Sequence, residues 1–300
     1  MTASLPDPAA VLASVDWTAD TAPRPVEGGW DNLIWKVQRG GELFALRVFR
    51  FDPSAEPGVQ ARAAEHELKA SAVALASGLP APEILASGEF EGAPFSIQRW
   101  LPGAPLIDVV KRSPWHTRRL GREFGRLQAR MHTIPGDPLR LSADTDWVER
   151  AEHPGLVAYI RDATTAVPPK FCHFDYHPLN VLAEGTQISG LIDFANAAGS
   201  DPRADLGLTN ALLRAAPVPP GFTRKLIDVI RRRFLAGWRD GYIDYAGHFP
   251  LEPAFEALGY AIYLHEFSLA MREGRGWADE RDIAKLRTLR DERIAAAGLG

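Results

Sequence analysis

The most informative segment of the chain is His173-Phe174-Asp175-Tyr176-His177-Pro178-Leu179-Asn180, and a second acidic turn follows it at Leu191-Ile192-Asp193-Phe194. The two segments place a carboxylate, a carboxamide and a second carboxylate on two closely linked loops. A strand-like run precedes the first loop, and further strand-like runs lie between the two loops. This combination suits the positioning of a hydroxyl nucleophile beside a magnesium-bound nucleoside triphosphate.

Each polar side chain of these loops matches a role in phosphoryl transfer. Asp175 is expected to accept, or at least to orient, the proton of the substrate hydroxyl. Asn180 offers a neutral oxygen ligand for Mg²⁺, and Asp193 offers a charged one that can bridge the metal and the phosphates. A single Asp or Asn in a loop is usually a turn-former or a helix cap, so the prediction depends on the joint pattern.

The joint pattern resembles the aminoglycoside phosphotransferase and choline kinase-like family. The run from His173 to Leu182 resembles its catalytic loop, and Leu191 to Phe194 resembles its metal-binding segment. Gly199 to Leu206 resembles the segment that follows in the family. The resemblance extends from about Gly28 to beyond Asp205 and implies the two-lobed protein-kinase-like fold of small-molecule kinases.

The resemblance also implies roles for individual residues. Asp175 would be the catalytic Asp, and Asn180 and Asp193 would be the magnesium ligands. Asp205 is expected to be structural rather than catalytic. His173 is expected to brace the loop by hydrogen bonding, with a directly catalytic His173 as the less favoured interpretation.

A glycine-containing segment, Glu27-Gly28-Gly29-Trp30-Asp31-Asn32, precedes the first strand-like run. Glycines there let backbone N–H groups approach phosphates closely, although a Gly-Gly pair alone is usually only a turn. The segment does not match the Gly-x-Gly-x-x-Gly pattern of protein kinases. It fits the looser glycine-and-asparagine loop of the phosphotransferase family better, so Gly28, Gly29 and Asn32 are expected to contact the nucleotide.

Ala45 and Arg47 match a second nucleotide-binding pattern. In kinase-like chains an alanine packs on the adenine, and a basic residue two positions later pairs with the α- and β-phosphates. Strand alternation puts both side chains on one face, as this pairing requires. The usual lysine is an arginine here, which binds phosphate and carboxylate groups bidentately. Glu67 of the following helix is the expected carboxylate partner of Arg47, with Glu65 as the runner-up.

The segment from Gln98 to Leu101, followed by Pro102-Gly103, resembles the hinge whose backbone meets the nucleotide base. Gln98 and Trp100 are therefore expected beside the base. Asp205 follows Asp193 too soon for a long activation loop, and no Ala-Pro-Glu element comes after it. Both features favour a small-molecule acceptor over a protein substrate.

The apolar periodicity changes character along the chain. Period-two alternation and turn residues predict an early group of strands, at residues 32–37, 43–51, 84–86 and 94–101. One helix is expected among them, at residues 59–77. Later helices are predicted at residues 120–132, 206–215, 222–245, 253–272 and 278–297. Short strands around the two loops are predicted at residues 170–174, 180–183 and 187–194.

This pattern predicts an α+β fold with two lobes. Residues 1–100 are expected to form an N-terminal nucleotide-binding lobe, with a small antiparallel sheet and one main helix. Residues 101–300 are expected to form a larger, mainly helical lobe that carries catalysis and acceptor binding. Acceptor contacts are expected from aromatic and acidic residues of the C-terminal helices, namely Tyr242, Asp244, Tyr245, Glu256, Tyr260, Tyr263 and Glu266.

Composition sets further limits. Among the 300 residues, 46% are hydrophobic and 24% charged, as in ordinary globular proteins. The formal charge of −4 gives no basic footprint, so neither nucleic acid nor an anionic membrane surface is an expected partner. The single cysteine, Cys172, favours a reducing compartment and is expected to be a buried hydrophobe. No signal peptide and no long apolar run is evident, which predicts a cytoplasmic protein.

The leading hypothesis is therefore an ATP- or GTP-dependent, Mg²⁺-requiring kinase that phosphorylates a hydroxyl of a small metabolite or antibiotic, as a monomer or homodimer. One alternative is a nucleotide-binding pseudoenzyme with a regulatory role. Another is a metal-dependent hydrolase that uses His173, Asp175 and His177, although the other histidines are scattered singly. For His177, packing is favoured over a contact with the substrate.

Overall fold

The computed structural model describes residues 6–26, 32–49, 58–139, 147–217, 224–276 and 278–300. The chain divides into two compact units. The first comprises Met1–Pro102 together with Gly190–Ala195, and the second comprises Gly103–Ser189 and Asn196–Gly300. Asp193 thus groups with the first unit, although the sequence on either side of it belongs to the second.

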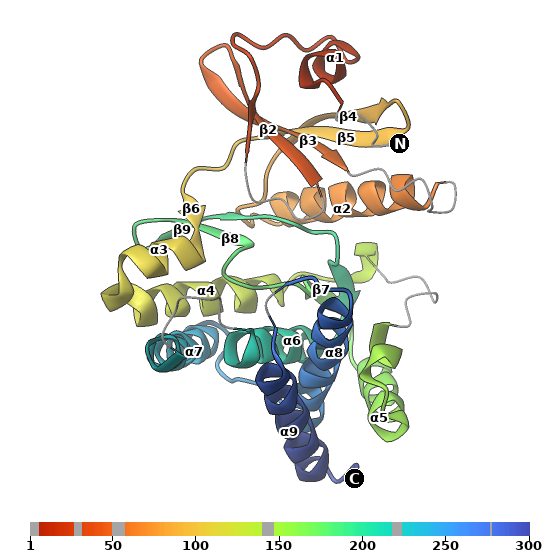
Figure 1. The fold of residues 1–300 in the computed structure, drawn as a ribbon, viewed down its shortest axis with the longest axis vertical. Helices are drawn as coiled ribbons and strands as arrows, with labels where there is room; N and C mark the ends of the chain where they lie inside the picture. The colour runs from red at the N-terminus through yellow and green to blue at the C-terminus, as the bar shows by residue number, and fades with distance from the viewer. Residues whose placement is uncertain (1–5, 27–31, 50–57, 140–146, 218–223, 277) are drawn as a thin grey trace. The chain divides into compact units, whose positions relative to one another are not determined.

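The first unit is built on a five-stranded antiparallel sheet of order β1-β2-β3-β5-β4 (Figure 1). The strands are β1 (Arg24–Pro25), β2 (Asn32–Arg39), β3 (Glu42–Phe49), β4 (Ile84–Phe90) and β5 (Ala93–Arg99). Two helices accompany the sheet, α1 (Pro8–Ala13) and α2 (Val59–Ala76).

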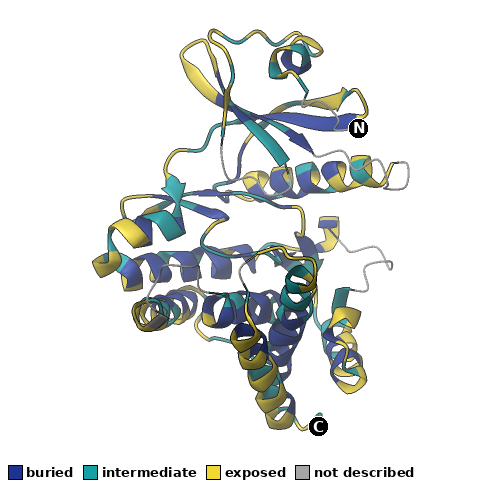
Figure 2. Ribbon diagram, viewed as in Figure 1, coloured by how far each residue is buried: buried dark blue, intermediate teal, exposed yellow. Residues whose placement is uncertain are grey.

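Strand alternation gives the sheet one apolar face. Phe44, Leu46 and Val48 of β3 are buried and pack in one cluster with Val11 and Leu12 of α1. The intervening residues of β3 therefore point to the opposite face, on the side where Arg47 meets α2. Figure 2 shows β5, which is buried over most of its length, in dark blue.

The second unit is mainly helical. Its helices are α3 (Leu106–Arg112), α4 (Thr117–Met131), α5 (Pro154–Thr165), α6 (Pro202–Ala215), α7 (Arg224–Ala246), α8 (Pro253–Arg272) and α9 (Glu280–Ala296). Its short strands are β6 (Ala104–Pro105), β7 (Lys170–Cys172), β8 (Val181–Glu184), β9 (Gln187–Leu191) and β10 (Ala198–Ser200). They form a three-stranded sheet, β6-β8-β9, and a two-stranded sheet, β10-β7; the last residues of β9 group with the first unit.

Glycines let the helices α4 and α7 lie side by side at very short range (Figure 1). A Cβ atom at Gly125 would lie 2.0 Å from the carbonyl oxygen of Trp238. One at Gly241 would lie 1.9 Å from the carbonyl oxygen of Arg122. No side chain fits between the two backbones there, so this contact fixes the position of α4.

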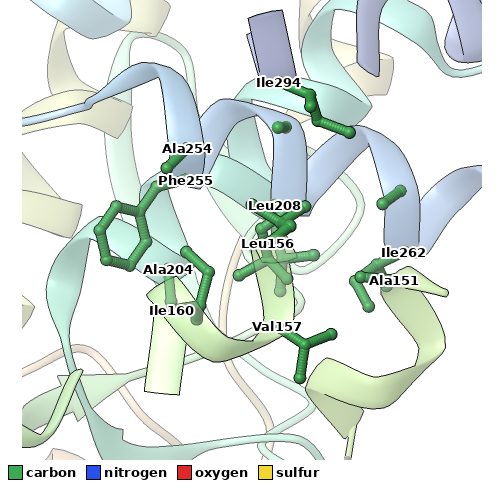
Figure 3. Packing of buried hydrophobic residues seen from close by; sticks show 13 residues of the cluster. Ala151, Leu156, Val157, Ile160, Ala204, Leu208, Ala254, Phe255, Ile262 and Ile294 are labelled. Carbon is green, nitrogen blue, oxygen red and sulfur yellow. The ribbon is translucent and has the colours of Figure 1, made fainter. Parts of the chain in front are cut away.

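Helix α6 is held by α8 in the same manner, because a Cβ at Gly207 would lie 2.1 Å from the carbonyl oxygen of Phe255. An apolar cluster that includes Leu156, Leu208 and Phe255 joins α5, α6 and α8 (Figure 3). Interiors of this kind are close-packed and move little. The polar side chains of α4 and α6 are therefore carried on rigid supports.

Most predicted elements occur close to their expected bounds, and the predicted combination of an antiparallel sheet with a larger helical part is confirmed. The strand expected at 187–194 ends at Leu191, and the helix expected from 206 already begins at Pro202. The short helices α1, α3 and α5 were not predicted, since six to twelve residues carry little periodic signal.

Candidate active site

One face of the first unit's sheet carries the residues expected at the nucleotide. Ala45 lies opposite Gln98 of β5 and Lys36 of β2, and Arg47 lies opposite Ser96. Directly paired residues of an antiparallel sheet share a face, so these side chains line a single surface. Gln98 is nearly buried, and its amide nitrogen donates to the Ser96 hydroxyl at 2.9 Å.

Arg47 joins two carboxylates within the first unit. Its guanidinium makes an ion pair and a hydrogen bond with Glu67 of α2, and its Nη2 lies 3.6 Å from Oδ1 of Asp193. Glu67 is only 4% exposed, whereas the side chain of Asp193 is 44% exposed. Glu65, the other candidate for this pairing, is exposed.

Burial raises the pKa of Glu67. The Arg47 charge opposes this effect, and the neighbouring Asp193 charge adds to it, so the pKa stays above its ordinary value. The backbone N–H of Phe194 also donates to the Glu67 carboxylate. Glu67 therefore ties β3 to the turn that carries Asp193, and this cluster has two carboxylates for one guanidinium.

Asp193 adopts a left-handed backbone conformation, with φ at +65°. Aspartate is one of the few non-glycine residues found there, and such outliers concentrate at functional sites. The backbone N–H of Leu191 donates to the carbonyl of Pro80 at 2.8 Å and anchors the start of the turn. The turn thus holds a partly exposed carboxylate in a defined place.

The loop between β7 and β8, in the second unit, engages both oxygens of the Asp175 carboxylate. Nδ2 of Asn180 lies 3.0 Å from Oδ2, and the same nitrogen lies 3.0 Å from the Asp175 carbonyl oxygen. Nε2 of His177 lies 3.2 Å from Oδ1. Burial alone would raise the pKa of Asp175, but its polar neighbours, first His177, outweigh this effect and hold the pKa below its usual range.

The Asp205 side chain of α6 holds the start of this loop in place. Its Oδ1 accepts a 2.6 Å hydrogen bond from the backbone N–H of Phe174, which has a left-handed φ of +59°. Its Oδ2 accepts from Gln128 at 2.7 Å and lies 2.9 Å from Nε2 of His132. Asp205 is fully buried; burial raises its pKa, but His132 and Gln128 outweigh that effect and lower it overall.

A second set of contacts fixes the middle of the loop. The hydroxyl of Tyr176 donates to the carbonyl of Phe124 at 2.7 Å, and the hydroxyl of Thr209 donates to the Tyr176 carbonyl at 3.2 Å. Gln128 also donates to Thr209 and accepts from the indole N–H of Trp238. The loop is therefore held by α4, α6 and α7 together.

Comparison with known proteins identifies the family. Residues 23–258, most of the chain, match the profile of the APH phosphotransferase enzyme family. The chain belongs to this phosphotransferase family. The family resemblance expected from the loop motifs is thereby confirmed. Among curated proteins, none matches this sequence.

Solved structures of phosphotransferases share the fold. A thermostable mutant of the aminoglycoside phosphotransferase APH(4)-Ia, in a ternary complex with AMP-PNP and hygromycin B, is 16% identical with a TM-score of 0.60, over 97% of this chain and 99% of that one. Amicoumacin kinase hAmiN, in complex with AMP-PNP, Ca²⁺ and Ami, is 13% identical with a TM-score of 0.58, over 97% and 94%.

A third similar structure is spectinomycin phosphotransferase APH(9)-Ia in complex with ADP and spectinomycin. It is 11% identical with a TM-score of 0.55, over 91% of this chain and 89% of that one. These likenesses confirm the predicted kinase-like fold. The family match makes the chain a phosphotransferase enzyme.

The remaining nucleotide-side predictions of this phosphotransferase have different outcomes. Gly28 and Gly29 lie outside the described residues. Asn32 is the first residue of β2. The backbone N–H of Trp100 donates to the Leu43 carbonyl at 3.0 Å, and the ammonium of Lys36 lies 4.6 Å from the centre of the Trp100 ring. Lys36 is thus a second cation on the Ala45 face that sequence reasoning did not assign to the site.

The candidate acceptor residues differ in their burial and in their contacts. Tyr242 is buried and hydrogen-bonded to His132, and Tyr260 is buried and hydrogen-bonded to Asn210. Tyr263 is different. Burial raises its pKa well above the ordinary value, and the charge of Asp175 raises it further. Its ring packs against the same apolar cluster as Phe174 of the β7–β8 loop.

Other candidates on the same helices are engaged in surface ion pairs. Asp244 pairs with Arg122 and Arg126, whereas Glu266 pairs with Arg150 at 2.7 Å. Tyr245 is half exposed. Glu256 lies 3.4 Å from a guanidinium nitrogen of Arg293 and accepts a hydrogen bond from Asn210.

Sequence reasoning missed Gln128 and His132 as supports of the β7–β8 loop. Their spacing of four residues on the buried side of α4 puts both beside Asp205, and this was a readable signal. It also did not predict the contact between His177 and Asp175, because packing was the favoured interpretation of His177.

Three further observations concern other features raised by the sequence. Within the described ranges, no group of three or more His, Cys, Asp and Glu side chains is arranged to hold a metal ion. Cys172 is fully buried, and burial raises the pKa of its thiol well above the ordinary value. In the part of the chain that the structure describes, no helix has the length and apolar character needed to cross a membrane.

Proposed function

We propose that this phosphotransferase moves the γ-phosphoryl group of ATP or GTP to a hydroxyl of a small-molecule acceptor. Asp175 orients the acceptor hydroxyl and takes its proton. Asn180 and Asp193 hold Mg²⁺, and Arg47 contacts the phosphates. The observation that carries the proposal is the paired engagement of the Asp175 carboxylate by His177 and Asn180 on a loop of the family's catalytic type.

The state of Asp175 supports its role as the base. Its lowered pKa keeps it ionised at neutral pH. Each carboxylate oxygen has two acceptor positions, and one donor occupies one position on each. Lone pairs therefore remain for the acceptor hydroxyl, whose proton passes to Asp175 as its oxygen forms the new bond to phosphorus and the bond to the nucleoside diphosphate breaks.

The donor chemistry of Asn180 and Asp193 fits magnesium. The amide nitrogen of Asn180 is used by Asp175, and within the described residues its amide oxygen accepts no hydrogen bond. Asp193 presents a partly exposed carboxylate beside the Arg47–Glu67 ion pair, and with Asp193 the cluster has one carboxylate more than Arg47 can neutralise. Oxygen ligands of this kind are those that Mg²⁺ prefers. The ion would neutralise charge on the transferred phosphoryl group.

The guanidinium of Arg47 has the chemistry of a phosphate ligand. A guanidinium has five N–H groups in a planar fork, so one face can hold Glu67 while another meets phosphate oxygens. The similar structures support the choice of nucleotide, because two were solved with AMP-PNP and one with ADP. Their other organic ligands are hygromycin B, Ami and spectinomycin, which supports a small hydroxyl compound as the acceptor class.

The acceptor hydroxyl would lie beside a partly apolar surface of the second unit. The rings of Phe174 and Trp147 are 4.9 Å apart, and both rings and that of Tyr263 pack around the same apolar cluster. No described residue hydrogen-bonds to the Tyr263 hydroxyl, so this group can bind a polar atom of the acceptor. Arg150 and Glu266 neutralise each other nearby.

The test is Mg²⁺-dependent release of ADP or GDP by the purified chain in a screen of hydroxyl-bearing metabolites and antibiotics. The proposal predicts release that rises with a suitable acceptor and phosphate found on that acceptor by mass spectrometry. Asp162→Asn, an exposed carboxylate on α5, is the matched control and should leave turnover unchanged.

Other outcomes would sink the proposal. Nucleotide binding without transfer to any acceptor would indicate the regulatory pseudoenzyme instead. Hydrolysis that ignores nucleotide and follows a copurified transition metal would indicate a metal hydrolase.

A further inference from the structure

His177 contacts two different parts of the catalytic loop, and these contacts decide which ring nitrogen carries the proton. Nδ1 lies 3.2 Å from the backbone N–H of Leu179, a group that can only donate. Nδ1 must therefore be the acceptor, which leaves the proton on Nε2. Nε2 lies 3.2 Å from Oδ1 of Asp175, a carboxylate oxygen that can only accept.

The opposite tautomer would lose both interactions. A proton on Nδ1 would face the Leu179 N–H, and the lone pair of Nε2 would face the Asp175 carboxylate. Its only compensation would be the 3.4 Å contact between Nε2 and the amide nitrogen of Asn180, which is long for a hydrogen bond. The imidazole of His177 is thus oriented by the backbone on one side and donates on the other.

The segment that orients His177 is itself anchored. The carbonyl of Pro178 accepts a 3.0 Å hydrogen bond from the backbone N–H of Ile107, at the start of α3. Proline also fixes its own φ, which limits the motion of the short link between His177 and Leu179. The Asn180 N–H donates to the His177 carbonyl at 2.9 Å and closes the turn.

We infer that His177 is a positioning residue for the transfer reaction: it fixes one oxygen of the Asp175 carboxylate while Asn180 fixes the other, and so selects the orientation in which Asp175 receives the acceptor hydroxyl. This inference rests on the proposed function of Asp175. With both oxygens held, the carboxylate cannot rotate about its last bond. With His177 removed, only Oδ2 stays fixed, and Oδ1 is free to turn towards solvent.

Two variants distinguish loss of the hydrogen-bond donor of His177 from loss of its side-chain volume. In His177→Gln, the amide nitrogen can occupy about the position of Nε2 and donate to Asp175. In His177→Asn, the shorter side chain places its nitrogen near the position of Nδ1 and cannot reach Oδ1. His177→Ala removes both nitrogens. The native His177 side chain is only partly buried, with 20% exposure.

The experiment measures kcat and KM for nucleotide and acceptor, with the first acceptor that the ADP-release screen yields. Misplacing a reacting group by about 1 Å costs about 100-fold in rate. We therefore expect kcat to fall about 10- to 100-fold in His177→Asn and His177→Ala, with the nucleotide KM within about twofold. His177→Gln should keep kcat within about threefold of the native value.

The inference is overturned if His177→Ala keeps the native kcat, or if the Gln and Asn variants lose equal activity. Thermal midpoints of all three variants check that each is folded, and the Gln–Asn pair carries the comparison if the alanine variant does not fold. Asp175→Asn, measured in the same assay, distinguishes a failure of the inference about His177 from a failure of the proposed function. If it keeps full turnover, the proposed function fails; if it loses turnover while His177→Ala does not, only the role of His177 fails.

Discussion

Replacing Asp205 with asparagine should destabilise the second unit while leaving the volume of its interior unchanged. Asp205 is fully buried and accepts from the Phe174 backbone, Gln128 and His132. An asparagine that keeps its oxygen towards Phe174 turns its NH₂ group towards Gln128 and His132. The bond to the Gln128 amide nitrogen, which can only donate, is then lost, whereas His132 can carry its proton on Nδ1 and accept at Nε2. The flipped amide loses the bond to Phe174 instead.

The size of the effect follows from these contacts. A hydrogen bond to a charged group contributes about 1.5–3 kcal/mol, so losing one costs about that much. In a unit of this size, each kcal/mol lowers the thermal midpoint by about 2–4 °C. Asp205→Asn should therefore melt at least about 3 °C below the native chain at pH 7 in calorimetry. Asp162→Asn, on the exposed surface of α5, is the control and should change stability by less than about 0.5 kcal/mol.

The pH dependence gives a second readout. Because the folded pKa of Asp205 is lowered, its contribution is fully present above the ordinary value of 3.8 and is lost as the pH falls through and below that value. The gap in unfolding free energy between the native chain and Asp205→Asn should stay constant from about pH 7 to about pH 5 and narrow below about pH 4. A variant that melts with the control, or a gap that widens in acid, would refute this account of the loop's support.

Three further changes test other parts of the molecule. Glu67→Gln should raise the nucleotide KM about 10-fold because Arg47 loses its buried anionic partner, whereas Glu65→Gln should not; equal KM values in steady-state kinetics would contradict this. Gly125→Ala should cost at least about 1–3 kcal/mol because its Cβ would meet a carbonyl oxygen at 2.0 Å, and calorimetry should find Gly155→Ala, whose Cβ meets nothing closer than 3.5 Å, near the native midpoint. Tyr263→Phe should raise the acceptor KM about 5- to 10-fold at unchanged nucleotide KM, and an unaltered acceptor KM would exclude a hydrogen bond from this hydroxyl.

The sequence was informative wherever the signal was local. Alternation in β3 placed Ala45 and Arg47 on one face, and the spacing of Asp175 and Asn180 on one loop indicated that they act together. Glu65 and Glu67 could not be separated from sequence. Two residues apart on a helix, they point in nearly opposite directions, and the face that α2 turns to the sheet depends on tertiary packing.

Other features depend on contacts between distant segments. Asp205 contacts Gln128, which lies 77 residues away in the chain, and the sequence around neither residue indicates this contact. The contact of His177 with Asp175 follows from the curvature of a loop that includes a left-handed Phe174, and no residue preference predicts that conformation for phenylalanine. Such geometry is set by the helices that support the loop.

Measuring phosphoryl transfer by the Asp175→Asn variant is the most direct test of whether Asp175 receives the proton of the acceptor hydroxyl. The variant keeps the size of the side chain but removes the carboxylate that is proposed to receive the hydroxyl proton. Phosphoryl transfer to the acceptor should fall by at least about 100-fold, while the nucleotide Kd, measured by calorimetric titration, stays within about threefold of the native value. Full acceptor turnover by Asp175→Asn would contradict the account.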